Sequence, residues 1–291
     1  MKANDLYRNK KSALSFEFFP YRDAASAKSF AETIGVLAPL KPDYMSVTFG
    51  AGGSTCDGSY QTVRQLVKDH GQPTVAYIAG YGLAPEAIIQ VLDRYRDLGI
   101  QTIFVLRGDQ PKEADFAAHP DSFTYASDLI AFIKKNYSFT LGCAGYPEGH
   151  LECQSPEKNL DYLKQKVDNG AEYVVTQYFY DNDFFFRYVD QCRKAGIQVP
   201  IIPGVMPVYT LKMTQNLAKV CGSSIPPFLQ ARMDAVDASD KQAVLDLGAD
   251  FATQQCRGLL KTGIAGLHIY TMDRSYTTAK IVNTLRSENL L

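Results

Sequence analysis

Short runs of hydrophobic residues alternate along the whole chain with longer stretches in which hydrophobic positions recur every three or four residues. The short runs have the length of buried β-strands, and the longer stretches have the spacing of amphipathic helices. Strands are expected at residues 14–19, 44–49, 74–79, 102–106, 139–144, 173–178, 200–203 and 266–271. Helices are expected at residues 24–37, 58–69, 85–98, 156–169, 183–195 and 276–286, with one more ending near 135 and two or three between 209 and 262.

This alternation predicts a parallel sheet, because parallel neighbours need a long crossover connection such as a helix. Eight strands are the number that closes a barrel, so the expected fold class is α/β, a single-domain (β/α)8 TIM barrel over residues 1–291. An open, doubly wound sheet is the alternative. Against it, no predicted strand is followed by the turn G-x-G-x-x-G that is typical of such folds.

Composition narrows the class of protein. Of the 291 residues, 46% are hydrophobic and 21% are charged, and the net charge of -1 does not favour a nucleic-acid partner. The first residues are polar and basic rather than apolar, and no apolar run approaches the ~20 residues of a membrane span. The six cysteines form no C-x-x-C pair, and no His and Cys have zinc-ligand spacing. We therefore expect a cytoplasmic protein with no metal site and no nucleic-acid or membrane partner.

A carboxylate lies inside the first predicted strand, in the run Ser15-Phe16-Glu17-Phe18-Phe19. Strand side chains alternate, so Ser15 and Glu17 share one face, and the phenylalanine face packs on helices. Glu17 then points into the barrel near the carboxyl end of the strand, where the active sites of this fold lie. Apolar surroundings favour a protonated carboxyl group, which predicts a proton donor. A structural carboxylate paired with an arginine is the alternative.

Three more polar residues follow predicted strands. Asp109 follows the fourth strand, Gln177 ends the sixth, and Arg274 follows the eighth. Each alone also fits an ordinary structural residue, but the carboxyl ends of barrel strands meet at one mouth, so together with Glu17 they predict an active site. The glycine-rich loop at 50–54 offers backbone N–H groups to a phosphate, although by itself a simple turn explains it better.

The segments at these strand ends, taken in order, resemble the methylenetetrahydrofolate reductase family in its short bacterial form. The segments are SFEFFP at 15–20, SVTFG at 46–50, LRGD at 106–109, YASDL at 125–129, AGYPEGH at 144–150, KVDNGA at 166–171, TQYF at 176–179, IPGVMP at 202–207 and HIYTMDR at 268–274. No single segment is specific, and the ordered set carries the resemblance.

The resemblance implies a flavoprotein of one-carbon metabolism. Such an enzyme reduces 5,10-methylenetetrahydrofolate to 5-methyltetrahydrofolate with hydride from reduced FAD, which NADH or NADPH reloads. By the same resemblance Glu17 is the general acid, Asp109 is a catalytic carboxylate that contacts both pterin and flavin, and Gln177 and Arg274 contact folate. The corresponding flavin-contact positions are Thr48, Arg107, Gly108, Tyr125, Ala126, Tyr146, His150 and Lys166.

The chain departs from the family at several cofactor positions. Tyr77 replaces a His, Asn159 an acid and Tyr162 an amide, and we expect all three to contact the cofactor still. Gln165 replaces an Arg, so the resemblance implies FAD that binds less tightly than in other members.

Two alternative functions follow from these departures. One is a flavin-free reductase that takes hydride directly from NADH or NADPH. The other is a barrel subunit of a one-carbon redox complex that receives electrons from a partner protein, which the Met213 and Leu217 that replace a family Gln and Phe would suit. A homo-oligomer and a complex with a redox subunit both remain open.

Overall fold

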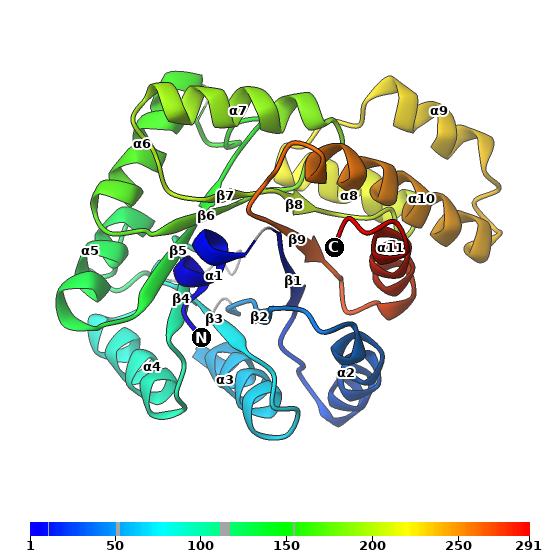
Figure 1. Ribbon diagram of the computed structural model, residues 1–291. Helices are drawn as coiled ribbons and strands as arrows, with labels where there is room; N and C mark the ends of the chain where they lie inside the picture. Colours follow the sequence, from blue (N-terminus) through cyan, green and yellow to red (C-terminus); the bar gives the residue numbers. More distant parts are fainter. Residues whose placement is uncertain (11, 51–52, 111–116, 154) are drawn as a thin grey trace.

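A ring of parallel strands surrounded by helices forms the protein (Figure 1). The computed structural model describes residues 1–10, 12–50, 53–110, 117–153 and 155–291, and for 53–55 the backbone only. The strand order is β7-β6-β5-β4-β3-β2-β1-β9-β8, and every neighbouring pair is parallel. The predicted (β/α)8 barrel is confirmed, and the open sheet is not what forms.

Each predicted strand and helix has a counterpart within a few residues. The strands are β1 (Ala13–Phe18), β2 (Tyr44–Val47), β3 (Thr74–Ala79), β4 (Thr102–Leu106), β5 (Thr140–Gly145), β6 (Tyr173–Thr176), β7 (Ile201–Ile202), β8 (Gly204–Val205) and β9 (Gly266–Tyr270). The helices are α1 (Ala3–Asn9), α2 (Ala24–Leu37), η1 (Ala38–Leu40), α3 (Gly53–Lys68), α4 (Pro85–Asp97), α5 (Ala126–Asn136), α6 (Pro156–Asp168), α7 (Asn182–Lys194), α8 (Leu211–Cys221), α9 (Pro227–Ala235), α10 (Lys241–Leu260) and α11 (Ser275–Ser287).

The seventh strand, expected at 200–203, extends to Val205 and is split at Pro203 into β7 and β8, which is why nine strands form where eight were expected. Proline has no N–H to give to a ladder, so it interrupts pairing where it stands. Before it, β7 pairs with β6, and after it, β8 pairs with β9. The carbonyl of Pro203 still accepts the N–H of His268 at 3.1 Å. The two halves of one short segment thus join the two edges of the sheet and close the ring.

Helix α1 was not predicted, because its seven residues are too few for a hydrophobic period to emerge. It lies inside the ring of strands in Figure 1. Its Ala3 and Tyr7 are buried and join the inward-facing side chains of the strands, among them Tyr44 and Tyr173. The ring of Tyr7 meets that of Tyr44 edge-on at 6.4 Å. The helix therefore plugs the amino-terminal end of the barrel, which leaves the carboxyl ends for a ligand.

Helix α8 lies outside the ring of strands and contributes side chains to the end of the barrel at which the strands have their carboxyl ends. It begins after Thr210, whose hydroxyl accepts the N–H of Met213 at 3.1 Å. It ends at Gly222, which adopts the left-handed conformation with φ of 72° that glycine tolerates best. Between these caps, Leu217 and Cys221 face the cavity described below.

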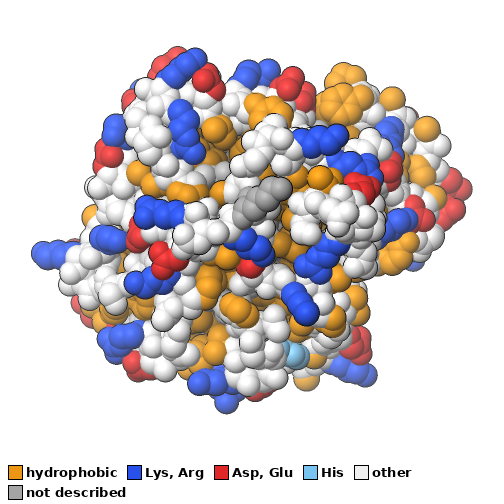
Figure 2. All heavy atoms as spheres, in the orientation of Figure 1, with side chains coloured by type: hydrophobic (Ala, Val, Ile, Leu, Met, Phe, Trp, Pro, Cys, Tyr) orange, Lys and Arg blue, Asp and Glu red, His pale blue; other side chains and the backbone are white. Residues whose placement is uncertain are grey.

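The surface carries charges of both signs. Figure 2 shows Lys and Arg intermixed with Asp and Glu on the face that Figure 1 presents, with hydrophobic side chains between them. That face therefore has no single-sign patch of the kind that binds polyanions. Among the helices that the structure describes, none is both long and apolar enough to cross a lipid bilayer.

Gly204 should be essential where β8 pairs with β9 and closes the ring, a place we call the closing seam. A Cβ at this position would lie 2.6 Å from Cε2 of Tyr270. We predict that Gly204→Ala lowers the free energy of unfolding by about 1–3 kcal/mol through overpacking. Gly35 is the matched control, because a Cβ at this exposed position of α2 meets nothing within 4 Å. Gly35→Ala should raise the stability by roughly 0.5–1 kcal/mol. Urea unfolding measures both, and equal effects in the two variants would contradict the packing argument.

Candidate active site

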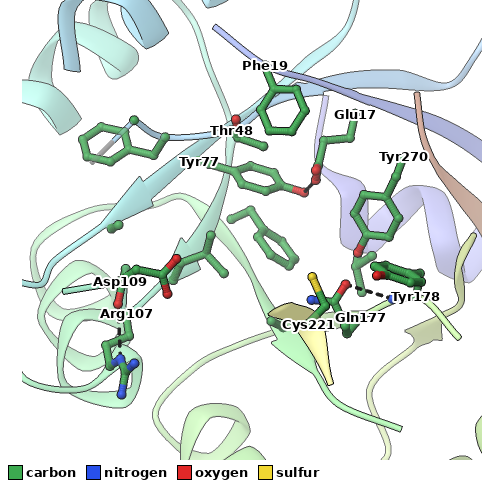
Figure 3. A pocket seen from close by; sticks show the side chains of 18 of the residues that line it. Glu17, Phe19, Thr48, Tyr77, Arg107, Asp109, Gln177, Tyr178, Cys221 and Tyr270 are labelled. Atoms are coloured by element: carbon green, nitrogen blue, oxygen red, sulfur yellow. Dashed lines mark hydrogen bonds between the residues drawn. The ribbon is translucent and has the colours of Figure 1, made fainter. Parts of the chain in front are cut away.

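A cavity of about 610 Å³ opens at the carboxyl ends of the strands, opposite α1 (Figure 3). Its lining includes most of the residues singled out from the sequence. These are Glu17, Thr48, Tyr77, Arg107, Gly108, Asp109, Tyr146, His150, Gln177 and Leu217. The tertiary structure thus gathers residues from six strands and the loops behind them into one site, as the barrel geometry requires.

Glu17 lies at the floor of this cavity with its side chain 13% exposed. The hydroxyl of Tyr77 donates to Oε2 of Glu17 at 2.6 Å, and Nε2 of His268 lies 3.3 Å from the same oxygen. Burial, reinforced by the nearby carboxylate, raises the pKa of Tyr77 well above its usual range, so this tyrosine stays protonated and donates. No arginine among the described residues pairs with Glu17, so the structural alternative for this carboxylate lacks its partner.

Asp109 reaches the cavity through a turn that only glycine fits easily. Gly108 has a φ of 89°, and a Cβ there would lie 3.0 Å from the Cβ of Ala79 on the neighbouring strand. The carbonyl of Arg107 accepts the backbone N–H of Tyr81 at 2.8 Å, which ties the end of β4 to that of β3. The exposed carboxylate of Asp109 is thus held at the mouth, on the side of the cavity occupied by Arg107 in Figure 3.

Gln177 lines the cavity and Arg274 does not. The side-chain oxygen of Gln177 accepts the N–H of Tyr178 at 3.0 Å, which leaves its amide N–H groups to face a ligand. Arg274 is exposed two residues beyond Met272, which lines the cavity, and its guanidinium lies 5.9 Å from the ring centre of Tyr209. The structure therefore brings three of the four predicted polar residues together and leaves Arg274 outside the lining.

Sequence reasoning missed much of the aromatic lining. Phe19, Tyr81, Phe104, Tyr178 and Tyr270 all face the cavity, and Phe104 stacks on Tyr77 with ring centres 4.5 Å apart. Strand register was the signal that could have found one of them, because Tyr270 is the β9 partner of Glu17. Aromatic faces of this kind favour a flat ligand.

A basic group without an acidic partner lies beside the cavity. Nζ of Lys166 donates to the carbonyl of Ala144 at 2.5 Å, and no described carboxylate pairs with it. Burial lowers the pKa of Lys166, which shows that its charge is poorly compensated. Arg107, in contrast, makes a two-pronged ion pair with Glu152 at 2.5 and 3.0 Å. Lys166 is the cation better placed to receive an anion.

The start of helix α5 offers donors near the same side of the barrel. Its N-cap residue, Tyr125, makes no side-chain capping bond and is 58% exposed. The first N–H groups of a helix have no partner inside it, and those of Ala126 and Ser127 hydrogen-bond to none of the residues that the structure describes. An uncapped helix start of this kind is suited to a phosphate.

Asn159 and Tyr162 lie outside the cavity lining. The Asn159 side chain accepts the N–H of His150 at 3.0 Å and donates to the carbonyls of Cys153 and Ser155 at 2.9 Å each. It thus braces the loop that carries His150, which accounts for an amide where the family has an acid. Tyr162 is 49% exposed on α6.

Part of the loop at 50–54 that was considered for phosphate lies outside the described residues. Residues 51 and 52 are not described, and for 53 and 54 only the backbone is. Gly50 lines the cavity, and its N–H donates to the hydroxyl of Ser59 at 3.1 Å.

The turn after β9 is strained and carries a half-buried acid. Met272 and Asp273 have φ of 50° and 55°, a conformation that non-glycine residues rarely adopt. Oδ1 of Asp273 accepts the N–H of Phe19 at 3.0 Å, so this carboxyl group fixes the start of the loop after β1. Burial, with a smaller effect from Glu17, raises the pKa of Asp273 to about 6 despite that hydrogen bond.

Comparisons with known proteins agree on one family. The family model described as methylenetetrahydrofolate reductase matches residues 2–286. The 5,10-methylenetetrahydrofolate reductase of Escherichia coli is 32% identical over 272 residues, which cover 94% of this chain and 90% of that protein. Methylenetetrahydrofolate reductase (NADH) 1 of Arabidopsis thaliana is 34% identical over 284 residues, which cover 94% of this chain but 48% of that protein. The chain thus spans about half the length of the plant relatives it matches.

Solved structures show the same fold at low sequence identity. An uncharacterized protein from Clostridium thermocellum that binds two copies of 5-methyl-5,6,7,8-tetrahydrofolic acid superposes with a TM-score of 0.65 and 16% identity, over 100% of both chains. The dihydropteroate synthase of Xanthomonas albilineans superposes with a TM-score of 0.50 and 11% identity, over 96% of this chain and 94% of the other. At these identities the likeness establishes the barrel fold alone.

Asp273→Asn should change how stability depends on pH. Because the pKa of Asp273 rises from 3.8 to about 6 on folding, the folded protein holds this proton more tightly than the unfolded chain. The stabilisation is fully present below about pH 4 and is lost as the pH rises through about 6. Asparagine cannot ionise, so the unfolding free energy of the variant minus that of the wild type should increase between these values and then level off. Urea unfolding over this range measures the difference, and parallel curves would refute the assignment.

Proposed function

The chain belongs to the methylenetetrahydrofolate reductase family, and we propose from this that it reduces 5,10-methylenetetrahydrofolate to 5-methyltetrahydrofolate as a single-domain barrel. The observation that carries the proposal is the Glu17 carboxyl group, held by two partners at the floor of an aromatic cavity. A proton donor beside a surface for flat rings is what this reaction needs. The bacterial reductase that the chain matches over 90% of its length supports the same substrate.

Glu17 would open the methylene bridge of the substrate. The bridge joins two nitrogens, and protonation of one of them breaks its bond to the methylene carbon and leaves a cationic iminium on the other. A carboxylic acid within hydrogen-bond reach gives this proton in the transition state, and the resulting carboxylate is stabilised by the Tyr77 hydroxyl. Asp109, exposed at the mouth, would stabilise the positive charge of the iminium. Gln177 would orient the pterin through its uncommitted amide N–H groups.

The residues beside the cavity fit FAD. A diphosphate would supply the counter-charge that Lys166 lacks among the described residues, and the N–H groups of Ala126 and Ser127 would bind the same group. The exposed ring of Tyr125 lies at this helix start, and His150 and Tyr146 line the same cavity as Glu17. When bound, FAD would carry hydride from NADH or NADPH to the substrate, and the name of the Arabidopsis relative specifies NADH.

One departure from the family, Asn159, and one ion pair, that of Arg107, should weaken FAD binding without abolishing it. Asn159 is engaged with its own loop, and Arg107 is engaged with Glu152, so neither is free to bind FAD in this arrangement. Each charge-assisted hydrogen bond contributes roughly 1.5–3 kcal/mol, so the loss of one weakens binding about tenfold or more. The same two contacts are the observation that favours a flavin-free reductase as the second candidate.

Glu17→Gln should abolish folate reduction while NADH oxidation with an artificial electron acceptor persists. The amide keeps the shape of the side chain but cannot give up a proton, so we expect a loss on the order of 10²-fold or more in the rate of folate reduction. Glu32→Gln, at an exposed position of α2, is the matched control and should be fully active. Steady-state rates with each acceptor measure the effect. A Glu17→Gln variant that reduces folate at the wild-type rate would eliminate the general-acid role, and a wild type that never oxidises NADH would favour an electron-donating partner protein.

Lys166→Met should lower the affinity for FAD by roughly 10- to 100-fold, because it removes a charge-assisted contact to the diphosphate. Lys158→Met, at an exposed position of the same helix, should leave the affinity unchanged. Quenching of flavin fluorescence during titration of flavin-free protein measures the FAD dissociation constants of both variants.

FAD should also raise the melting temperature of the wild type, since it binds only the folded state. Colourless protein whose melting temperature and activity do not respond to FAD would instead support the flavin-free reductase.

A further inference from the structure

His268 is a fully buried ionisable residue directly beneath Glu17. It lies on β9, beside Ser15 in the parallel ladder with β1, and its side chain points into the barrel. Nε2 lies 3.3 Å from Oε2 of Glu17, and Nδ1 lies 2.8 Å from the hydroxyl of Ser15. Both ring nitrogens therefore have a partner, one of which is the proposed general acid.

The surroundings of the imidazole leave it little freedom. The ring of Tyr44 lies 6.3 Å from it, and the ring of Tyr270 meets it edge-on at 5.1 Å. The hydroxyls of Tyr44 and Tyr7 lie 2.6 Å apart and hydrogen-bond to each other. Burial raises the pKa of Tyr44 to about 12, so these phenols are neutral. Glu17 is the one carboxylate among the described residues that hydrogen-bonds to the imidazole.

The two carboxyl oxygens of Glu17 differ in their hydrogen-bond partners. Oε2 is contacted by both Tyr77 and His268, whereas no described residue hydrogen-bonds to Oε1. The hydroxyl of Ser15 lies 2.8 Å from Nδ1 and 3.3 Å from the carbonyl of Leu267, so the shorter contact allows it to donate to Nδ1. The imidazole proton is then on Nε2, which can donate to Glu17. Two donors on one oxygen orient a flexible carboxyl group and leave the other oxygen to carry the transferable proton.

We propose that His268, oriented by Ser15, is a positioning residue that fixes Oε2 of Glu17 so that Oε1 presents its proton to the substrate. This inference rests on the proposed reduction of methylenetetrahydrofolate. It assigns His268 no contact with substrate or cofactor, since the side chain is completely buried under Glu17. Substitution of His268 should therefore affect only the step in which Glu17 donates its proton to the substrate.

The expected signature is a split between two reactions of the same protein. His268→Leu should lower kcat for folate reduction by about tenfold or more, because Glu17 loses one of its two anchors. The KM for methylenetetrahydrofolate, the dissociation constant for 5-methyltetrahydrofolate and the rate of NADH oxidation with an artificial acceptor should stay within about twofold. His268→Gln should recover part of the loss, since its amide N–H can reach the position of Nε2–H. Ser15→Ala should lower the same kcat, but by less than His268→Leu.

Steady-state kinetics, product binding by calorimetry and thermal melting of the four proteins test the proposal together. An unchanged kcat in a folded His268→Leu variant, or equal losses in both reactions, would overturn it. Should the His268→Leu variant fail to fold, the His268→Gln and Ser15→Ala variants decide the question. If His268 had a role that does not act through Glu17, the kcat of these two variants would be unchanged. A wild type that cannot reduce folate would reject the proposed function itself, and this inference with it. A wild type that reduces folate while all three variants match it rejects the positioning role alone.

Discussion

Closure of the ring at the split seventh strand is the constraint on which the rest of the site depends. Each half of that strand contributes only two paired residues, so the seam needs help from side chains. Thr176 supplies it from β6: its hydroxyl accepts the N–H of Gly204 at 3.1 Å, and its carbonyl accepts the hydroxyl of Tyr270 at 2.8 Å. These contacts join β6, β8 and β9 across the seam. They hold β9, and with it His268 and Tyr270, in register beside β1 and Glu17.

Polar side chains lie inside this barrel between the α1 plug and the floor of the cavity. Hydrogen bonds join Tyr7 to Tyr44, Ser15 to His268 and His268 to Glu17, between the plug formed by α1 and the floor of the cavity. Buried polar groups cost several kcal/mol when left unpaired, so such a set is tolerated only if its members satisfy each other. Burial keeps the phenols neutral, and the one carboxyl group of this set, that of Glu17, lies at the end that opens to the ligand.

Departures from the family pattern have structural explanations in this fold. Tyr77 stands where the resemblance places a His, and its hydroxyl donates to Glu17. Asn159 replaces an acid, and its amide is committed to the loop that carries His150. Tyr77 lines the cavity itself and also supports Glu17, whereas Asn159 lies outside the lining and supports the loop that carries His150. The proposed affinity for FAD then depends more heavily on Lys166 and on the start of α5.

The sequence alone determined the strand and helix positions, the barrel and the inward direction of Glu17, because hydrophobic period and side-chain alternation are local properties of the chain. Only the tertiary structure decided which side chains meet. The partners of Glu17 lie 60 and 251 residues away, and they depend on the register between strands and on which strands become neighbours when the ring closes. The same holds for the break at Pro203 and for the α1 plug. Neither feature produces a hydrophobic periodicity in the sequence. The break depends on the N–H that Pro203 lacks within a strand ladder, and the plug depends on a space that exists only once the strands have closed into a ring.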